Sequence, residues 1–277
     1  MIQTNRFQEL IQIASESRLL ALEAMYHCGS GHPGSAFSTI DILVALFFGG
    51  GIKYRANNPN WKGRDYFLLS NGHAVPALYA VLAKAGYFPE AEMKGLRKLG
   101  FGAQGHPHRG SLPGIEISSG SLGQGLSVGI GLARAIKNKK TSQKVFVLMS
   151  DGEQEEGSTW EAVMLAPKLQ LNNLIAIVDK NGMQIDGTTK DVMPSLDPLA
   201  EKYRAFGWEV IEIDGHNFDE ILKALAVNSA SGPRVIISKT IRGKGVSFME
   251  GSIHWHAGKI TDEQYVQAKK EIMSNVN

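Results

Sequence analysis

Acidic, amide and imidazole side chains stand beside glycine directly after four short runs of apolar and β-branched residues. The segments are SNGH at 70–73, SDGE at 150–153, DKNG at 179–182 and DGH at 214–216. In open α/β folds, ligands bind at the edge of the sheet where parallel strands reach their carboxyl ends. These four segments are therefore the first candidates for a binding or catalytic site.

Two of these segments have residues suited to a divalent cation. Asp151 and Asn181 are 181 − 151 = 30 positions apart, which is the length of one βαβ unit. A right-handed crossover sets the two strands parallel and close together, so both side chains reach the same edge of the sheet. With a backbone carbonyl after Gly182, they form an all-oxygen ligand set of the kind Mg²⁺ prefers. The alternative is that Asp-Gly and Asn-Gly are only turn dipeptides between strand and helix.

Three histidines have a placement that favours contact with a ligand. His32, His73 and His106 each follow a glycine in an expected loop, where an imidazole reaches a ligand more easily than in a core. Neutral imidazoles exchange protons with hydroxyl groups near pH 7, although an isolated loop histidine often has no function. The remaining histidines expected to be loop or surface residues are His27, His108, His216 and His254.

Five segments taken together resemble the signature motifs of transketolases. The segment SDGEQEEGSTWEAVMLAPKLQLNNLIAIVDKNGMQIDG is similar to the thiamin diphosphate motif, which begins with GDG and ends with asparagine about one βαβ unit later. The other segments, in chain order, are SGHPGS at 30–35, SNGH at 70–73, QGHPHRG at 104–110 and GSLGQG at 120–125. The match runs from about residue 17 to residue 258. Several motifs in the correct order are far more specific than any one of them.

The resemblance implies a site for Mg²⁺, or another divalent cation, and for thiamin diphosphate. It assigns the metal to Asp151, Asn181 and the backbone carbonyl of Met183. The residues that it places at the diphosphate are Gly152, Asn181, His73 and His256. Those that it places against the aminopyrimidine ring are Gly120, Ser121 and Leu122.

The same resemblance implies the catalytic residues His32, His106 and His256, which would line the channel for the sugar's hydroxyls and its reacting carbon. Glu156 matches a family acid at the contact between two cofactor sites. His256 is preferred over His254 because it directly precedes Ala-Gly, as the family histidine precedes its own small pair. Ser150 departs from the motif, where glycine is usual, and a serine costs little there if its φ is negative.

A parallel α/β sheet is needed to position these residues. Strands are expected at Tyr66–Leu69, Val145–Met149, Leu174–Val178, Trp208–Ile213 and Val235–Ser238. Helices are expected near 5–27, 36–48, 74–86, 120–139, 157–170, 197–206, 217–229 and 262–274. The strands are nearly continuous apolar runs, as is typical when helices cover both faces. We therefore expect one α/β domain over residues 1–277, with a mostly parallel sheet covered by helices on both faces, as in the diphosphate-side module of the thiamin diphosphate-binding fold.

Composition excludes several classes of protein. Hydrophobic residues make up 43% and charged residues 20% of the chain, which excludes disordered, collagen-like and coiled-coil proteins. The 29 basic and 27 acidic residues are dispersed, so no nucleic-acid footprint is present. The single cysteine, Cys28, excludes a disulfide framework. The longest apolar run, Ile42–Phe48, is far below the ~20 residues of a membrane span. We expect a cytoplasmic protein without membrane contact.

The resemblance also implies a partner chain. In the family, a glutamate on a second domain acts on the aminopyrimidine ring, and most groups that hold the sugar phosphate lie on that domain too. The chain resembles the amino-terminal half of a split transketolase, so the expected partner is a C-terminal transketolase subunit, in an α2β2 assembly. Gly125, Gly129 and Gly131 in the helix near 120–139 are expected to let another backbone approach.

Three functions are compatible with these residues. The favoured one is transfer of a two-carbon ketol unit from a ketose phosphate to an aldose acceptor. The first alternative is an α-type subunit of another thiamin diphosphate enzyme, such as a deoxyxylulose phosphate synthase or a 2-oxoacid dehydrogenase, although the loop histidines argue against the dehydrogenase. The second is a non-catalytic cofactor-binding module, which the intact Asp151, Asn181 and site histidines disfavour.

Overall fold

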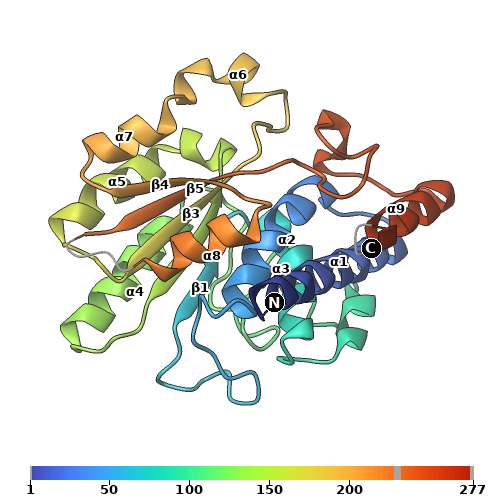
Figure 1. Cartoon of the computed structure of the whole chain (residues 1–277), viewed down its shortest axis with the longest axis horizontal. Coiled ribbons are helices and arrows are strands. Elements are labelled where there is room, and N and C mark those ends of the chain that lie inside the picture. The colour runs from blue at the N-terminus through green and yellow to red at the C-terminus, as the bar shows by residue number, and fades with distance from the viewer. Residues whose placement is uncertain (1, 228–231, 275–277) are drawn as a thin grey trace.

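A five-stranded parallel sheet forms the centre of the computed structural model, which describes residues 2–227 and 232–274 (Figure 1). The strand order is β1-β2-β3-β5-β4, and all four strand pairs are parallel. The strands are β1 (Tyr66–Leu69), β2 (Val145–Ser150), β3 (Leu174–Lys180), β4 (Glu209–Asp214) and β5 (Arg234–Lys239). The predicted parallel α/β fold is confirmed, with each expected strand present within two residues of its predicted bounds.

Helices occupy most of the segments between strands. The α-helices are α1 (Ile2–Cys28), α2 (Pro33–Phe47), α3 (Val75–Lys84), α4 (Gly125–Asn138), α5 (Gly157–Lys168), α6 (Thr189–Val192), α7 (Leu199–Ala205), α8 (Phe218–Ala226) and α9 (Asp262–Ser274). Short 3₁₀ turns are η1 (Gly72–Ala74), η2 (Glu90–Gly95), η3 (Gly152–Glu155), η4 (Pro194–Leu196) and η5 (Ile253–His256). The 3₁₀ turns and α6 were not expected from the sequence, and the end of the helix expected at 217–229 lies outside the described residues.

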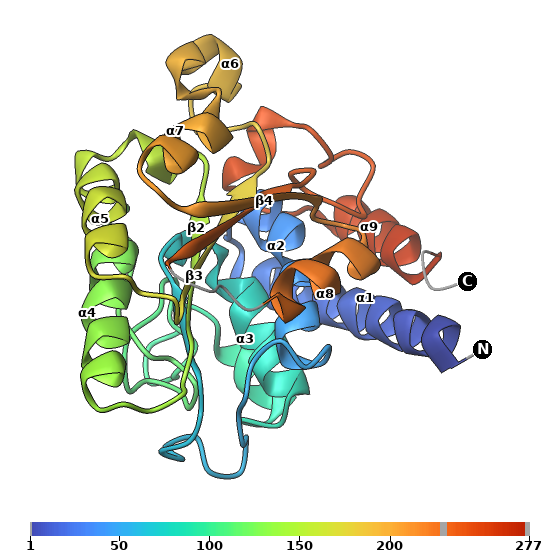
Figure 2. The same ribbon diagram turned by 60° about the vertical axis from the view of Figure 1, so that its left-hand side comes forward.

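The helices cover both faces of the sheet, as Figure 2 shows. Phe146 and Leu148 of β2 pack into one buried apolar cluster with α1, α2, α3 and α8, whereas Val147 and Met149 pack into a second cluster with α4, α5 and α7. Successive strand residues point to opposite faces, so a strand buried on both faces must be apolar throughout. This explains the continuous apolar runs of the sequence.

The helix expected from residue 120 begins only at Gly125. Gly123 has a φ of 80°, a left-handed conformation that interrupts a helix. The glycines of α4 were expected to let another backbone approach, and two of them do not. A Cβ on Gly125 would lie within 2.5 Å of Ser70, and one on Gly129 would lie 2.5 Å from Val147. These two glycines pack against their own sheet. Gly131 alone is exposed, with open space around its Cα.

The carboxyl edge of the sheet gathers the polar segments. The register pairs Ser150 of β2 with Asp179 of β3, so the residues that follow these two strands start side by side. Ser150 is the last residue of β2, in extended backbone. Because β5 lies next to β3, the segment after β5 joins the same edge.

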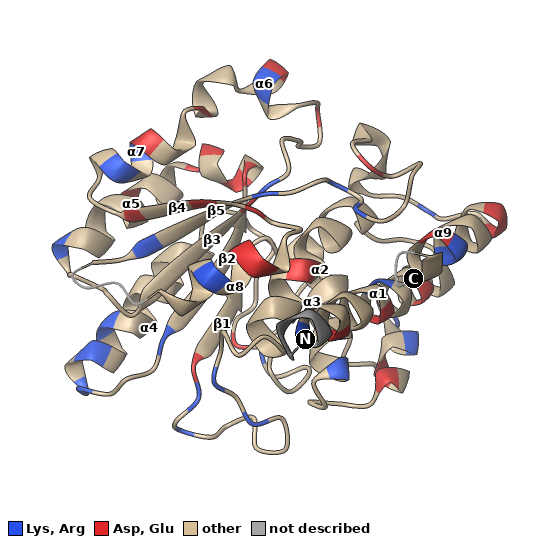
Figure 3. Cartoon of the chain, viewed as in Figure 1, with Lys and Arg blue, Asp and Glu red and all other residues tan. Residues whose placement is uncertain are grey.

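Charges are interspersed over the outer elements. Figure 3 shows basic and acidic residues spread over the helices and loops, in keeping with a formal net charge of +2. Within the described residues, no helix has the length and apolar character needed to cross a membrane.

Candidate cofactor and active site

A cavity of about 390 Å³ opens at the carboxyl edge of the sheet. Its wall comes from the start of α2 and the segment before it, from the loop before α4, and from the segments that follow β1, β2, β3 and β5. The predicted site residues that line it are His32, His73, His106, Gly120, Leu122, Asp151, Gly152, Asn181, Met183 and His256. Ser121 and Glu156 are exposed and do not line this cavity.

Four imidazole rings meet in the cavity. The ring centroid of His32 lies 5.5 Å from that of His73, 5.9 Å from that of His106 and 5.4 Å from that of His256. His73 and His256 are 5.6 Å apart, and Nε2 of His73 contacts Oγ of Ser35 at 3.1 Å. The structure thus brings His256 to the cavity, whereas the side chain of His254 is exposed outside it.

The histidines are neutral at pH 7. Burial, followed by the charge of neighbouring histidines and arginines, lowers the pKa of His32 to about 4 and that of His73 to about 3. Burial and then Arg242 lower the pKa of His256 to about 4. Burial and then Arg97 also lower the pKa of His106. A neutral imidazole donates from one nitrogen and accepts at the other, so each ring can exchange protons with a hydroxyl group.

Asp151 is a buried carboxylate held by two backbone amides. It is 1% exposed, and its Oδ1 and Oδ2 accept the N–H groups of Gly152 at 2.9 Å and Gly182 at 2.6 Å. Burial, and then the neighbouring Asp179 carboxylate, raise the pKa of Asp151 to about 7. A carboxylate in this position is short of positive charge, and a nearby cation would favour its ionised form.

Asn181 is oriented by a second buried carboxylate. Its Nδ2 donates to Oδ2 of Asp179 at 2.9 Å, and Ser38 donates to the same oxygen at 2.7 Å. With the amide nitrogen committed to Asp179, the Oδ1 of Asn181 accepts the N–H of Met183 at 3.1 Å and keeps a further lone pair. Asp179, which sequence reasoning did not single out, therefore fixes which atom of Asn181 is the acceptor.

These residues fit a hard divalent cation bound with a phosphate. A carboxylate, an amide oxygen and the region of the Met183 carbonyl all lie at one cavity wall, which is the ligand chemistry that Mg²⁺ prefers. Within the described residues, no group of three or more His, Cys, Asp and Glu side chains is arranged to hold a metal.

Arg242 is a site residue that the sequence reasoning missed. It follows β5 and is 1% exposed, yet it lines the cavity. Its Nη1 donates to the Gln184 carbonyl at 3.2 Å, its Nη2 contacts Nδ1 of His256, and its buried Nε has no hydrogen-bond partner in the described part of the chain. A Cβ at Gly34 would lie 2.7 Å from this Nε, so glycine in the 30–35 segment leaves room for the arginine. Its position just after a strand was the only signal in the sequence.

Glu153 is a second missed residue, and its role is positional. It is fully buried, and it accepts the Ser70 hydroxyl, the N–H of Gly123 at 2.8 Å and the N–H of Ser150 at 3.3 Å. These contacts join the ends of β1 and β2 to the loop before α4. Glu153 therefore fixes the loop that carries Gly120 to Leu122.

Comparison with known protein families shows the family to which the chain belongs. The family model described as "Transketolase, thiamine diphosphate binding domain" matches residues 10–275. The chain belongs to this family. Its five-stranded parallel sheet and its carboxyl-edge cavity are thus those of a transketolase-type thiamine diphosphate binding domain.

Individual relatives include separate transketolase subunits. An apulose-4-phosphate transketolase subunit of Phocaeicola vulgatus is 40% identical over 97% of this chain and 95% of its own length. The "6-deoxy-6-sulfo-D-fructose transketolase subunit SqwG" of a Clostridium species is 42% identical over 94% of each chain. Among solved structures, transketolase from Campylobacter jejuni superposes with a TM-score of 0.89 at 33% identity. The match covers 95% of this chain and 42% of the Campylobacter chain.

Proposed function

We propose that this chain is the cofactor-binding N-terminal subunit of a transketolase that moves a two-carbon ketol unit from a ketose phosphate to an aldose acceptor. The observation that carries the proposal is the convergence of Asp151, Asn181, Arg242 and four neutral histidines in one cavity of a transketolase-family domain. The similarity to transketolase subunits favours this function over a dehydrogenase, a deoxyxylulose phosphate synthase or a non-catalytic module.

The deep end of the cavity would hold the metal and the diphosphate. Asp151, Asn181 and the Met183 carbonyl would bind Mg²⁺, and Arg242 with His73 and His256 would contact the phosphates. The diphosphate carries about three negative charges near pH 7, so a cation and an arginine supply compensation that hydrogen bonds alone do not. The unpartnered Nε of Arg242 supports an anion at this place, because a buried donor left unpaired is costly.

His32 and His106 would act on the sugar. Bound thiamin diphosphate supplies a nucleophilic thiazolium carbon and an electron sink for carbon–carbon cleavage. Nδ1 of His32 lies 3.4 Å from Nη2 of Arg97, a cation that can only donate, so the proton of the neutral ring is on Nε2. His32 is thereby set to donate from Nε2 to an oxygen in the cavity, and His106 adds a second ring beside it.

We further propose that the partner is a C-terminal transketolase subunit, in an α2β2 assembly, and that the substrates are sugar phosphates. The support is that relatives of the same length are named as transketolase subunits. The substrates in the names of those relatives carry a phosphate or a sulfonate, so a ketose with an anionic end is the substrate class we expect here. Glu156, exposed beside the loop before α4, would lie at the contact between subunits.

Titration of the assembled enzyme with thiamin diphosphate at fixed Mg²⁺ tests the proposal. Asp151→Ala removes a charge-assisted ligand and should weaken cofactor binding about ten- to a hundred-fold, which corresponds to roughly 1.5–3 kcal/mol. Asp219→Ala, at a half-buried acid on α8 outside the cavity, is the matched control and should bind as wild type. Wild-type affinity in Asp151→Ala would remove the metal assignment.

A further inference from the structure

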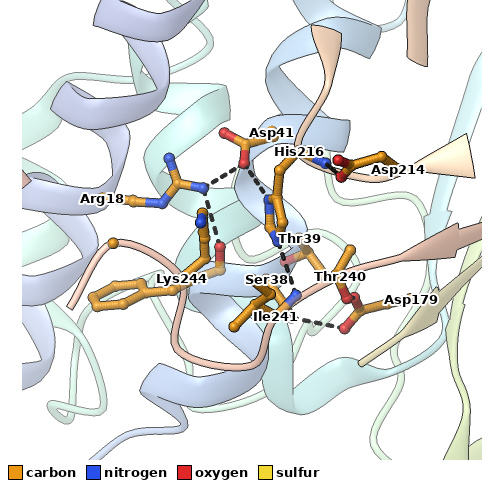
Figure 4. A network of polar contacts seen from close by, with 12 residues as sticks. Arg18, Ser38, Thr39, Asp41, Asp179, Asp214, His216, Thr240, Ile241 and Lys244 are labelled. Atoms are coloured by element: carbon orange, nitrogen blue, oxygen red, sulfur yellow. Dashed lines mark hydrogen bonds and ion pairs between the residues drawn. The ribbon is translucent and has the colours of Figure 1, made fainter. Parts of the chain in front are cut away.

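A line of polar contacts, buried at Arg18 and Asp41 and exposed at Ile241, connects α1 to the segment that follows β5 (Figure 4). Nη2 of Arg18 donates to Oδ2 of Asp41 at 2.6 Å, and the same oxygen lies 2.6 Å from Nδ1 of His216. Nε2 of His216 accepts the backbone N–H of Ile241 at 2.8 Å. Since Nε2 is an acceptor, the proton of the neutral ring is on Nδ1, and it points at Asp41. His216 lies in the loop between β4 and α8, as expected, but its side chain is only 12% exposed and is not a free surface group.

Asp41 is the fixed point of this line. Burial opposes its ionisation, but the charge of Arg18 and the hydrogen bonds from His216 and Arg18 more than offset the burial, so the pKa of Asp41 lies below its usual value. Nη2 of Arg18 also donates to the Phe37 carbonyl at 3.3 Å, which ties the guanidinium to α2. The carboxylate is therefore charged and accepts from both Arg18 and His216, and it sets the orientation of the imidazole.

The segment after β5 is held from a second side by Asp179. Thr240 donates its hydroxyl to Oδ1 of Asp179 and its N–H to the Lys180 carbonyl at 3.2 Å. Asp179 is the carboxylate that also orients Asn181. Ile241 thus follows the anchored Thr240, and its own N–H is held by Nε2 of His216.

Arg242 comes next in the chain, and its guanidinium lies in the cofactor cavity. The guanidinium has two polar contacts, to the Gln184 carbonyl and to His256, while its Nε has none, so its direction also depends on where the backbone at Ile241 is held. We propose that His216, oriented by Asp41 and Arg18, is a positioning residue that aims Arg242 at the cofactor's diphosphate. The inference rests on the proposed function, which supplies the diphosphate.

Two substitutions separate this role from general stability. In His216→Gln the amide reaches the place of Nε2 and can still accept from Ile241, whereas in His216→Asn the amide reaches only the place of Nδ1. On the assembled enzyme, calorimetric titration with thiamin diphosphate at fixed Mg²⁺ should show affinity about ten-fold weaker for His216→Asn, and within about three-fold of wild type for His216→Gln.

A double-mutant cycle shows whether the loss of thiamin diphosphate affinity in His216→Asn depends on Arg242. In an Arg242→Met background, His216→Asn should cause no further loss of affinity, because the group that it positions is gone. The control is Trp208→Phe, which removes a 2.8 Å hydrogen bond to the Val163 carbonyl on the opposite face of the sheet and should leave affinity unchanged.

The results distinguish failure of the positioning role of His216 from failure of the proposed function. Wild-type affinity in His216→Asn, or the same loss with and without Arg242, overturns the positioning role and leaves the proposed function standing. If the Asn variant does not assemble, the Gln variant decides, since a ten-fold loss in it contradicts the role given to the Ile241 contact. Failure of the wild-type enzyme to bind thiamin diphosphate would instead refute the proposed function.

Discussion

At the scale of single residues, the cavity separates groups that hold the cofactor from groups that face the substrate. His32 and His106 lie apart from the strand ends that carry Asp151 and Asn181. Their alanine variants should therefore keep cofactor affinity and lose kcat/KM by ~10²–10⁴ if either ring transfers a proton in the transition state. Steady-state kinetics in which the ketose phosphate concentration is varied from below to above its KM measures this. His108→Ala, an exposed histidine in the same loop, should behave as wild type. Normal turnover in both site variants would contradict the assignment.

The low pKa of His73 predicts a pH-dependent contribution to stability. In the unfolded chain its pKa is near 6.5, and in the folded protein it is about 3. Between these values the unfolded state binds more protons, so this contribution is fully present above about pH 6.5 and is lost as the pH falls. The buried acids Asp151, Asp179 and Glu153, with raised pKa values, act in the opposite direction.

The measurement is therefore a difference between two proteins. Relative to His73→Gln, the cofactor-free wild type should lose up to about 1.4 kcal/mol of unfolding free energy per pH unit between pH 6 and 4.5. Urea unfolding at several pH values gives this slope. If the difference in unfolding free energy between wild type and His73→Gln stays constant over this pH range, His73 is not held neutral by the fold.

At the scale of elements, the parallel sheet could be predicted from the sequence because strands buried on both faces must be apolar. The loop before α4 could not be predicted, because its shape depends on Glu153. Glu153 accepts a hydrogen bond from the backbone N–H of Gly123, which is 30 positions away in the sequence. The role of His216 was equally hidden, because its partner Asp41 is 175 positions away. Motif residues were found by type and spacing, whereas the residues that position them are specified by contacts between distant segments.

Helix α4 offers a test of how it packs. A Cβ on Gly129 would lie 2.5 Å from Cγ2 of Val147, whereas no atom lies within 4 Å of one on Gly131. Gly129→Ala should lower the free energy of unfolding by about 1–3 kcal/mol through overpacking, and Gly131→Ala should raise it by about 1 kcal/mol through helix propensity. Urea titrations of the two variants should therefore give changes in unfolding free energy, relative to wild type, of opposite sign. Equal destabilisation would mean that Gly131 also packs against something.

At the scale of the whole molecule, the outer layer of α4 and α5 has the character of an interface. These two helices lie side by side on one side of the sheet (Figure 2). Val128 of α4 and Met164 and Leu165 of α5 are 46%, 53% and 43% exposed. Exposed apolar side chains on neighbouring helices are typical of binding sites, and obligate interfaces bury more than ~2,000 Å². We expect the C-terminal transketolase subunit to cover this face.

The purified chain should accordingly lack ketol transfer until that partner is added. Light scattering should show self-association of the chain alone and a defined larger complex with the partner, because uncovered apolar surface favours association. Val128→Arg should weaken the complex and the restored activity together, since it places a charge within the apolar face. Val266→Arg is the control: Val266 is 66% exposed on α9, which packs on the opposite face of the sheet. Full activity from this polypeptide by itself would overturn the two-subunit proposal, and equal effects of the two arginines would move the interface away from α4 and α5.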